Sequence, residues 1–305
     1  MATVHISNIY QLIDLSVDQK VYDETTSEYI YYSKGSSDDP ITIYIDSDLD
    51  FNDIDPNSEY APYIYSWNGF NGTWYATIRG QKHKIKNMSY MGTALWAFLQ
   101  GATSNIVQNL IIEDMNITTS GIYCGLISSG QVYGCKISGI ISSSQAHCIG
   151  RASLVRDSAF IGDVTISSTP FYGISGGTNA VMINCFVRAN VKTLSTSNPY
   201  VYLLGPSCLN CYFVGTYTYG TTPTTNLAAT TSTTNFCYVV LKNIAEIQAD
   251  GFQSTRAIFP TSARSCLYEG TSPWSSASSG GVMMASLKGA APFKERGYAI
   301  RGGDS

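Results

Sequence analysis

The chain has 305 residues, of which 13% are charged, and it contains 22 tyrosines and 27 glycines. Its 18 basic and 22 acidic residues give a formal net charge of −4, which excludes a broadly basic nucleic-acid-binding protein. The low charge argues against long amphipathic helices, and the 44% hydrophobic content argues against disorder. The composition therefore predicts a β-rich protein whose surface is polar but mostly uncharged.

Acidic residues concentrate at the start of the chain. Residues 1–60 hold 13 acids and two lysines, a net charge of 2 − 13 = −11, so the remainder carries 16 − 9 = +7. This asymmetry could orient copies head-to-tail in an assembly, or it could keep an exposed end soluble. Residues 1–40 are predicted to form an N-terminal cap and docking segment.

Asp46, Asp48 and Asp50 alternate with apolar residues, as on an amphipathic strand with solvent-facing carboxylates. Their spacing also resembles the start of a calcium loop. Such a loop has glycine where this chain has Phe51 and glutamate where it has Asn57. No metal site is therefore predicted.

Aromatic residues gather between positions 60 and 75, and a basic run follows. Aromatic rings provide rigid contact area for sugars or protein partners, but here they could equally cover the first coils of the fold. Alternating lysines on one strand face could meet an anionic partner or simply form a solvated face. The candidate ligand-binding residues are Tyr63, Tyr65, Trp67, Trp74, Tyr75, Lys82, Lys84 and Lys86.

An internal repeat organises residues 107–215. One aligned column steps by 25, 23, 27 and 26 residues, and it consists of Leu110, Cys135, Ser158, Cys185 and Cys211. A second column, half a period away, consists of Cys124, Cys148, Tyr172 and Leu203. Short β-branched runs separated by Gly, Ser and Asn indicate strands joined by turns, with no helical periodicity. At about 3.3 Å per residue, one unit makes one closed coil, and such coils stack about 4.8 Å apart.

The predicted fold is all-β: a single-stranded right-handed parallel β-helix, or β-solenoid, over residues 41–240. Residues 216–235 are predicted to form a Thr-rich loop, and residues 241–305 a C-terminal cap and attachment segment. In this fold the cysteine columns become ladders of small buried thiols. Cys208 and Cys211 also form a C-x-x-C pair, for which a structural role is favoured over a metal or redox role.

Five segments, in order, resemble the GLUG-repeat family. They are residues 41–53, 70–88, 94–101, 106–112 and 123–130. The resemblance implies a scaffold of stacked β-coils, and members of that family occur in bacterial surface adhesins and bacteriophage virion proteins. The chain departs from the family at residues 79–83, where Arg-Gly-Gln-Lys-His replaces Asp-Gly-Asn-Gly-His, and its later coils lack the paired glycines.

Because parallel β-helices also include polysaccharide-cleaving enzymes, the acids of the repeat are candidate catalytic groups. They are Glu113, Asp114, Asp157 and Asp163. Adjacent strand residues point to opposite faces, and a glycosidase needs two carboxyls about 5 to 9 Å apart. A pairing of Asp114 with Asp157 across coils stays open. Nothing resembles a Ser/His/Asp or Cys/His set, so no catalytic residue and no cofactor is predicted.

The sequence thus favours a non-enzymatic structural or attachment protein, most specifically a bacteriophage virion component such as a fibre, tail, baseplate or capsid appendage. Its expected partners are other virion proteins, bound through the terminal segments, and two further copies in a homotrimer. Host-surface carbohydrate is a candidate ligand, whereas nucleic acid is not expected. The alternatives are a polysaccharide-cleaving β-helix enzyme and a bacterial cell-surface adhesin.

The N-terminus lacks a basic start followed by an apolar core, and no run approaches the ~18 apolar residues of a membrane span. Synthesis in the host cytoplasm, location in the virion and no membrane insertion are therefore expected. The bacterial cell surface is the alternative location.

Overall fold

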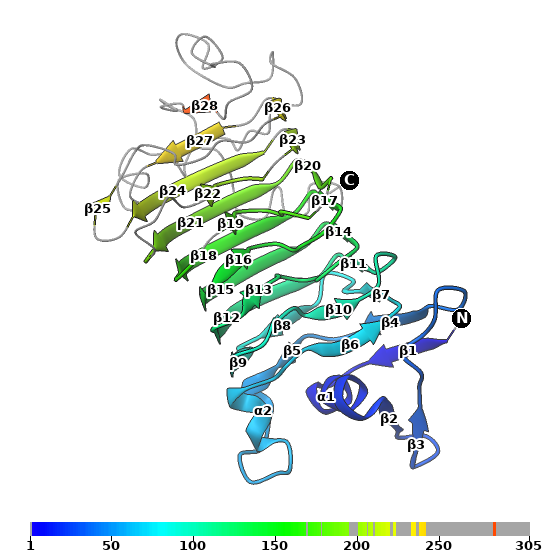
Figure 1. The fold of residues 1–305 in the computed structure, drawn as a ribbon. Coiled ribbons are helices and arrows are strands. Elements are labelled where there is room, and N and C mark those ends of the chain that lie inside the picture. Colours follow the sequence, from blue (N-terminus) through cyan, green and yellow to red (C-terminus); the bar gives the residue numbers. More distant parts are fainter. Residues whose placement is uncertain are drawn as a thin grey trace.

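The computed structural model describes residues 2–168, 170–177, 179–194, 201–205, 207–209, 211–219, 222–223, 233–235, 238–241 and 283–284. Its strands stack in successive coils, and each strand pairs in parallel with its equivalent one coil later (Figure 1). The predicted all-β solenoid is therefore confirmed. The predicted C-terminal segment, residues 241–305, lies outside the described residues except for Leu241, Met283 and Met284.

One sheet runs along the whole stack and starts inside the predicted N-terminal cap. Its strands, in spatial order, are β1 (Thr3–Ile6), β4 (Ile41–Ile45), β7 (Ala76–Arg79), β11 (Ile106–Gln108), β14 (Gln131–Tyr133), β17 (Leu154–Arg156), β20 (Val181–Ile183), β23 (Ser207–Leu209) and β26 (Thr233–Asn235). Val107, Val132 and Val155 lie above one another in register, and all three are buried. Each coil thus stacks one apolar side chain on the next.

The second sheet contains the longer strands. In spatial order they are β5 (Leu49–Asp50), β8 (Lys84–Lys86), β12 (Ile111–Thr119), β15 (Lys136–Ser143), β18 (Ala159–Ile166), β21 (Phe186–Thr193), β24 (Tyr212–Tyr219), β27 (Tyr238–Leu241) and β28 (Met283–Met284). Strand β9 (Ser89–Gly92) also pairs with β12, and β25 (Thr222–Pro223) pairs with β24. Residues 216–219 continue β24 and pair with β21, although the sequence predicts a loop from residue 216. Tyr217 is buried there, which favours the extended strand.

The third side of the coil is made of short strands. In the later coils these are β13 (Ile122–Tyr123), β16 (Gln145–His147), β19 (Phe171–Tyr172) and β22 (Val201–Tyr202). In the first coils β6 (Phe70–Trp74) pairs with β10 (Leu99–Gly101) in a separate sheet that lies just after this position, since Trp96 pairs with Tyr123 and Leu99 with Ile127.

The first predicted column lies entirely in the core, since all five of its residues are at most 1% exposed. The residue before each of the first four members turns the chain at the corner between two sheets with a positive φ. These corner residues are Asn109 (51°), Gly134 (59°), Asp157 (51°) and Asn184 (53°). Gly, Asn and Asp tolerate this left-handed conformation better than other residues do.

The second predicted column is shifted by one residue. Strand pairing places Tyr172 level with His147 and Tyr202, not with Cys148. The three rings stack with centroids 4.8 and 4.9 Å apart, which fixes this register. Cys124 and Cys148 are nonetheless buried thiols, as expected.

The N-terminal end of the solenoid is closed by α1 (Ile9–Asp18), at the lower end of the stack in Figure 1. Asn8 caps α1 by accepting a hydrogen bond from the Gln11 backbone N–H at 3.0 Å. One face of the helix is buried, and its Ser16 hydroxyl accepts a hydrogen bond from the Trp67 indole at 2.9 Å. The antiparallel hairpin of β2 (Lys20–Asp23) and β3 (Glu28–Tyr31) follows α1. The 3-10 helix η1 (Phe51–Asp53) and helix α2 (Ala61–Tyr65) complete this end.

Candidate binding cleft at the N-terminal end

The predicted aromatic candidates do not form one surface. Trp67 and Trp74 are fully buried, so no ligand reaches them, and their rings pack edge-on against Phe70 in the core. They cover the first coils, which was the alternative interpretation. Tyr65 is 74% exposed at the end of α2, whereas Tyr63 packs partly against the core.

Tyr75 lies at a corner of the coil and is half-buried. Its backbone N–H donates to the Lys34 carbonyl, and its own carbonyl accepts from the Ile41 N–H, both at 2.9 Å. Its backbone thus holds the segment that connects the hairpin to β4.

The lysine run is divided by the start of β8. Lys84 and Lys86 lie on that strand and are half-buried, whereas Lys82 precedes it with a φ of 70°. The Lys84 ammonium lies 3.2 Å from a carboxylate oxygen of Glu113 on the next coil. Lys84 thus makes a side-chain contact between coils, and the backbone of Lys86 pairs with Asp50 and Glu113 on the coils either side.

The acidic run 46–50 is also matched by the following coil. The amide of Gln81 donates to Asp46 at 2.6 Å, the Lys84 backbone N–H donates to Asp48 at 2.9 Å, and Asn87 donates to Asp50 at 2.7 Å. The Lys84 N–H is the main reason that the pKa of Asp48 is lowered. In the part of the chain that the structure describes, no three His, Cys, Asp or Glu residues are placed to hold a metal ion.

The acids of the later coils make similar contacts. Asp157 accepts from Asn184 at 2.9 Å and from the neighbouring Arg156 at 3.1 Å, and Asp163 accepts from Asn190 at 2.8 Å. These carboxylates join successive coils or hold an adjacent arginine.

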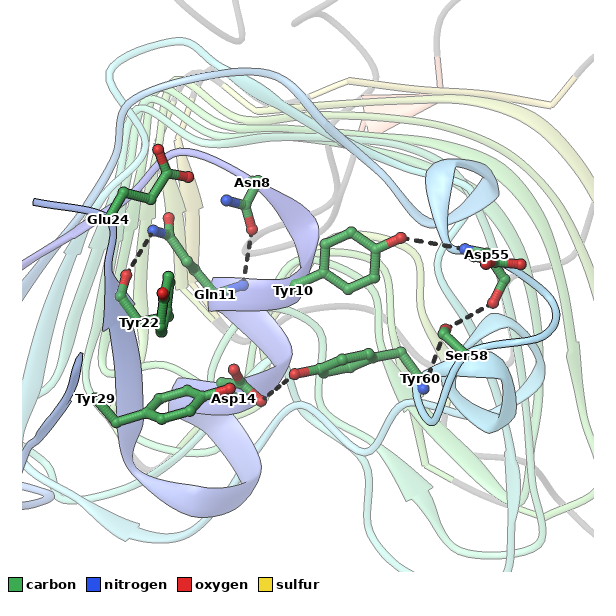
Figure 2. Close-up of a pocket in the computed structure, with 10 residues that line it drawn as sticks. All are labelled: Asn8, Tyr10, Gln11, Asp14, Tyr22, Glu24, Tyr29, Asp55, Ser58 and Tyr60. Carbon is green, nitrogen blue, oxygen red and sulfur yellow. Dashed lines mark hydrogen bonds between the residues drawn. The ribbon is translucent and has the colours of Figure 1, made fainter. Parts of the chain in front are cut away.

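A cleft of about 410 Å³ lies between α1, the β2–β3 hairpin and the loop after η1 (Figure 2). This volume falls in the usual range for small-molecule sites. The cleft is lined by Asn8, Tyr10, Gln11, Asp14, Tyr22, Glu24, Tyr29, Asp55, Ser58 and Tyr60. None of these residues is among the candidate ligand-binding residues predicted from the sequence, because they come from three segments that only the fold brings together.

Two pairs of tyrosines stand on opposite sides of the cleft in Figure 2. Tyr10 and Tyr60 meet edge to face with ring centroids 4.9 Å apart, and Tyr22 and Tyr29 do the same at 5.3 Å. The Tyr10 hydroxyl donates to the Asp53 carbonyl at 3.3 Å and accepts from the backbone N–H of Asp55 at 3.2 Å. These bonds fix the Tyr10 ring in place.

Asp14 lies between the two pairs and is only 6% exposed. The Tyr60 hydroxyl donates to its carboxylate at 2.9 Å. Burial raises the pKa of Asp14 and also that of Tyr60. A smaller hollow of about 80 Å³ shares Asp14 and Tyr60 with the cleft and is also lined by Tyr63. An acid on the apolar face of α1 was the one sequence signal that could have pointed here.

Comparisons with known proteins give little further guidance. No family model matches the chain, and no curated protein matches it. The chain is similar to a crystal structure of a "putative immunoglobulin A1 protease" from Bacteroides ovatus, with 15% identity and a TM-score of 0.44. The similarity covers 70% of this chain and 87% of the other, and at this level it carries no functional argument. No helix among the described residues has the length and apolar character of a membrane span.

Proposed function

We propose that this protein is a non-enzymatic attachment protein, in which a β-solenoid rod carries a ligand-binding cleft at its N-terminal end. The observation that carries this proposal is the place of the cleft. It is built by α1, the β2–β3 hairpin and the loop after η1, all at the end of the stack, whereas the coils behind it are filled by a continuous apolar core. A rod with a terminal cleft suits a spacer that presents a binding surface.

The non-enzymatic role is supported by three of the four candidate acids of the coils, all but Asp114. A β-helix enzyme that cuts polysaccharide needs carboxyls at a set separation on one face. Glu113, Asp157 and Asp163 instead bond to side chains of neighbouring coils or of adjacent residues. These contacts suit a role in joining coils.

We further propose a bacteriophage virion as the setting, with host-surface glycan as the ligand. This part rests on the resemblance of residues 40–215 to the GLUG-repeat family. Other virion proteins would then bind the terminal segments outside the cleft, and three copies would form the working unit. Light scattering on the purified chain tests the trimer, and mass spectrometry of purified particles tests the setting.

The decisive experiment measures binding and cleavage together. Purified protein is incubated with bacterial cells and with their isolated surface polysaccharide. We expect saturable binding with no new reducing ends. Absence of binding to every cell type tested would overturn the attachment role, and release of reducing ends would overturn the non-enzymatic role.

A second candidate, a polysaccharide-cleaving enzyme, is favoured by one observation. Burial raises the pKa of Asp14, which is the change that a carboxyl needs to act as a general acid near neutral pH. If cleavage is found, Asp14→Asn should abolish it.

A further inference from the structure

We infer that the N-terminal cleft binds a positively charged organic amine, that is, a primary or quaternary ammonium group. This inference rests on the proposed attachment function and specifies the ligand chemistry of the same site. It follows from the charge of the cleft, from its aromatic walls and from the burial of Asp14.

The cleft is anionic. Asp14, Glu24 and Asp55 line it, and no lysine or arginine is among its lining residues. The nearby Lys20 borders the smaller hollow and interacts with Asp14 and the Tyr29 ring, but its ammonium pairs with the Asp18 carboxylate at 2.8 Å, so the three carboxylates of the cleft still outnumber it. A ligand with a net negative charge would be repelled by this arrangement.

The walls suit a cation as well. The face of an aromatic ring attracts an ammonium group within about 6 Å of its centroid. Tyr29 shows this behaviour within the chain, because the Lys20 ammonium lies 4.8 Å from its ring centroid. Tyr10, Tyr22 and Tyr60 add three more rings around the same space.

Asp14 distinguishes a cation from a neutral sugar. A carboxylate that is 6% exposed is costly to keep ionised unless opposite charge compensates it. Its hydrogen-bond partner is the neutral hydroxyl of Tyr60, and the Lys20 ammonium, which pairs with Asp18, adds only a smaller attraction. An ammonium group in the cleft would compensate the charge, whereas a neutral sugar would provide only further hydrogen bonds.

The test uses choline and its neutral isostere 3,3-dimethylbutan-1-ol, which has the same shape without the charge. Calorimetric titration of the full chain should show binding of choline and at least about tenfold weaker binding of the isostere. Asp14→Asn and Tyr29→Ala should each weaken choline binding about tenfold. Equal binding of the two compounds, or no choline binding, would overturn the inference.

Tyr31→Ala is the matched control, because Tyr31 lies on the same strand, is 74% exposed and does not line the cleft. It should leave choline binding unchanged, and an equal loss in this variant would contradict the assignment to the cleft. Because Tyr29 is 42% exposed, Tyr29→Ala should fold. It therefore tests the role of the cleft in choline binding even if Asp14→Asn does not fold.

Three further arms separate the sources of the ammonium group. A glucosamine tetramer is compared with its N-acetylated form, phosphatidylcholine vesicles with phosphatidylglycerol vesicles, and a lysine peptide with its acetylated form. The charged amine of at least one pair should bind more tightly, and failure of all three would contradict the inference. Cell attachment that persists in Asp14→Asn and Tyr29→Ala would overturn this inference but leave the proposed attachment function standing. If the wild-type protein binds choline but attaches to no cells, the proposed attachment function is overturned and the inference about the ligand stands.

Discussion

Three residues of one buried column use their side chains in the same way. Cys135, Ser158 and Cys185 each donate to the carbonyl two residues earlier, at 3.2, 2.8 and 3.2 Å. The Ser158 hydroxyl also accepts from the backbone N–H of Cys135 at 3.1 Å, which links two coils. In these three coils the column therefore favours a small side chain with a donor, which explains serine and cysteine there, whereas Leu110 fills the same place in an earlier coil.

This requirement predicts a difference between two substitutions of Ser158. Ser158→Ala leaves the buried Cys135 N–H without its partner, whereas the Arg156 carbonyl keeps the Gly134 N–H, and it should lower the free energy of unfolding by about 1 to 3 kcal/mol. Ser158→Cys keeps a donor of the kind found in adjacent coils and should cost less. Urea unfolding of both variants measures the difference, and equal losses would show that the hydroxyl has no such role.

Burial of His147 should make the free energy of unfolding depend on pH. It is 5% exposed, it accepts a hydrogen bond from the Gly176 N–H at 3.0 Å, and burial lowers its pKa to about 3. The unfolded chain, with a histidine pKa of about 6.5, binds the proton more readily. The contribution of neutral His147 is therefore complete above pH 6.5 and is lost as the pH falls toward 3.

By pH 5 the loss should be on the order of 2 kcal/mol relative to pH 7. His147→Gln should remove this part of the pH dependence, as measured by urea unfolding at several pH values. His83→Gln is the control, since His83 is half-exposed beside Asp48, and it should keep the decline. A His147→Gln variant with the wild-type pH profile would refute the assignment.

At the scale of elements, the corner between the two long sheets defines the coil. Asn109 has a φ of 51°, and its backbone bonds to the coils on both sides, donating to Tyr133 and accepting from Lys82. Asn109→Ala should cost about 1 kcal/mol of unfolding free energy, because alanine adopts this conformation less readily. Asn109→Gly should be near neutral. Thermal unfolding compares them, and the opposite order would show that the backbone angle does not control this corner.

The corners also explain which features of the fold could be predicted from the sequence. The buried column was predictable because one small residue recurs once per coil, directly after a residue that tolerates a positive φ. The register of the short strands on the third side was not predictable. Cys148 and Tyr172 look equivalent in the sequence, and only the stacking of the His147 and Tyr172 rings in the structure shows that His147 is the equivalent residue. The burial of Trp67 and the cleft were not predictable either, because both depend on α1 folding back over the first coils.

At the scale of the whole molecule, the acidic N-terminal segment has a role inside the chain. Asp46, Asp48 and Asp50 each bond to the coil that carries the basic run. Three of the acidic residues that cause the charge asymmetry thus hold two successive coils together. The carboxylates of the cleft, Asp14, Glu24 and Asp55, are a separate part of the same excess.

The end of the rod depends on α1. An open solenoid end exposes apolar core and unpaired strand edges, which pair readily with other chains. Leu12 is fully buried on the inner face of α1, and Val17 on the same helix is 46% exposed. Aspartate at position 12 would place a charge in the core and lift the helix from the end of the stack.

Leu12→Asp should therefore lower the free energy of unfolding by about 3 kcal/mol or more and produce concentration-dependent association. Val17→Asp introduces the same charge on the exposed face and should change stability by no more than about 0.5 kcal/mol. Urea unfolding and light scattering over a concentration series compare the two variants. If Leu12→Asp keeps the stability and the mass of the wild type, α1 does not close the rod, and the cleft that it helps to form would not depend on this packing.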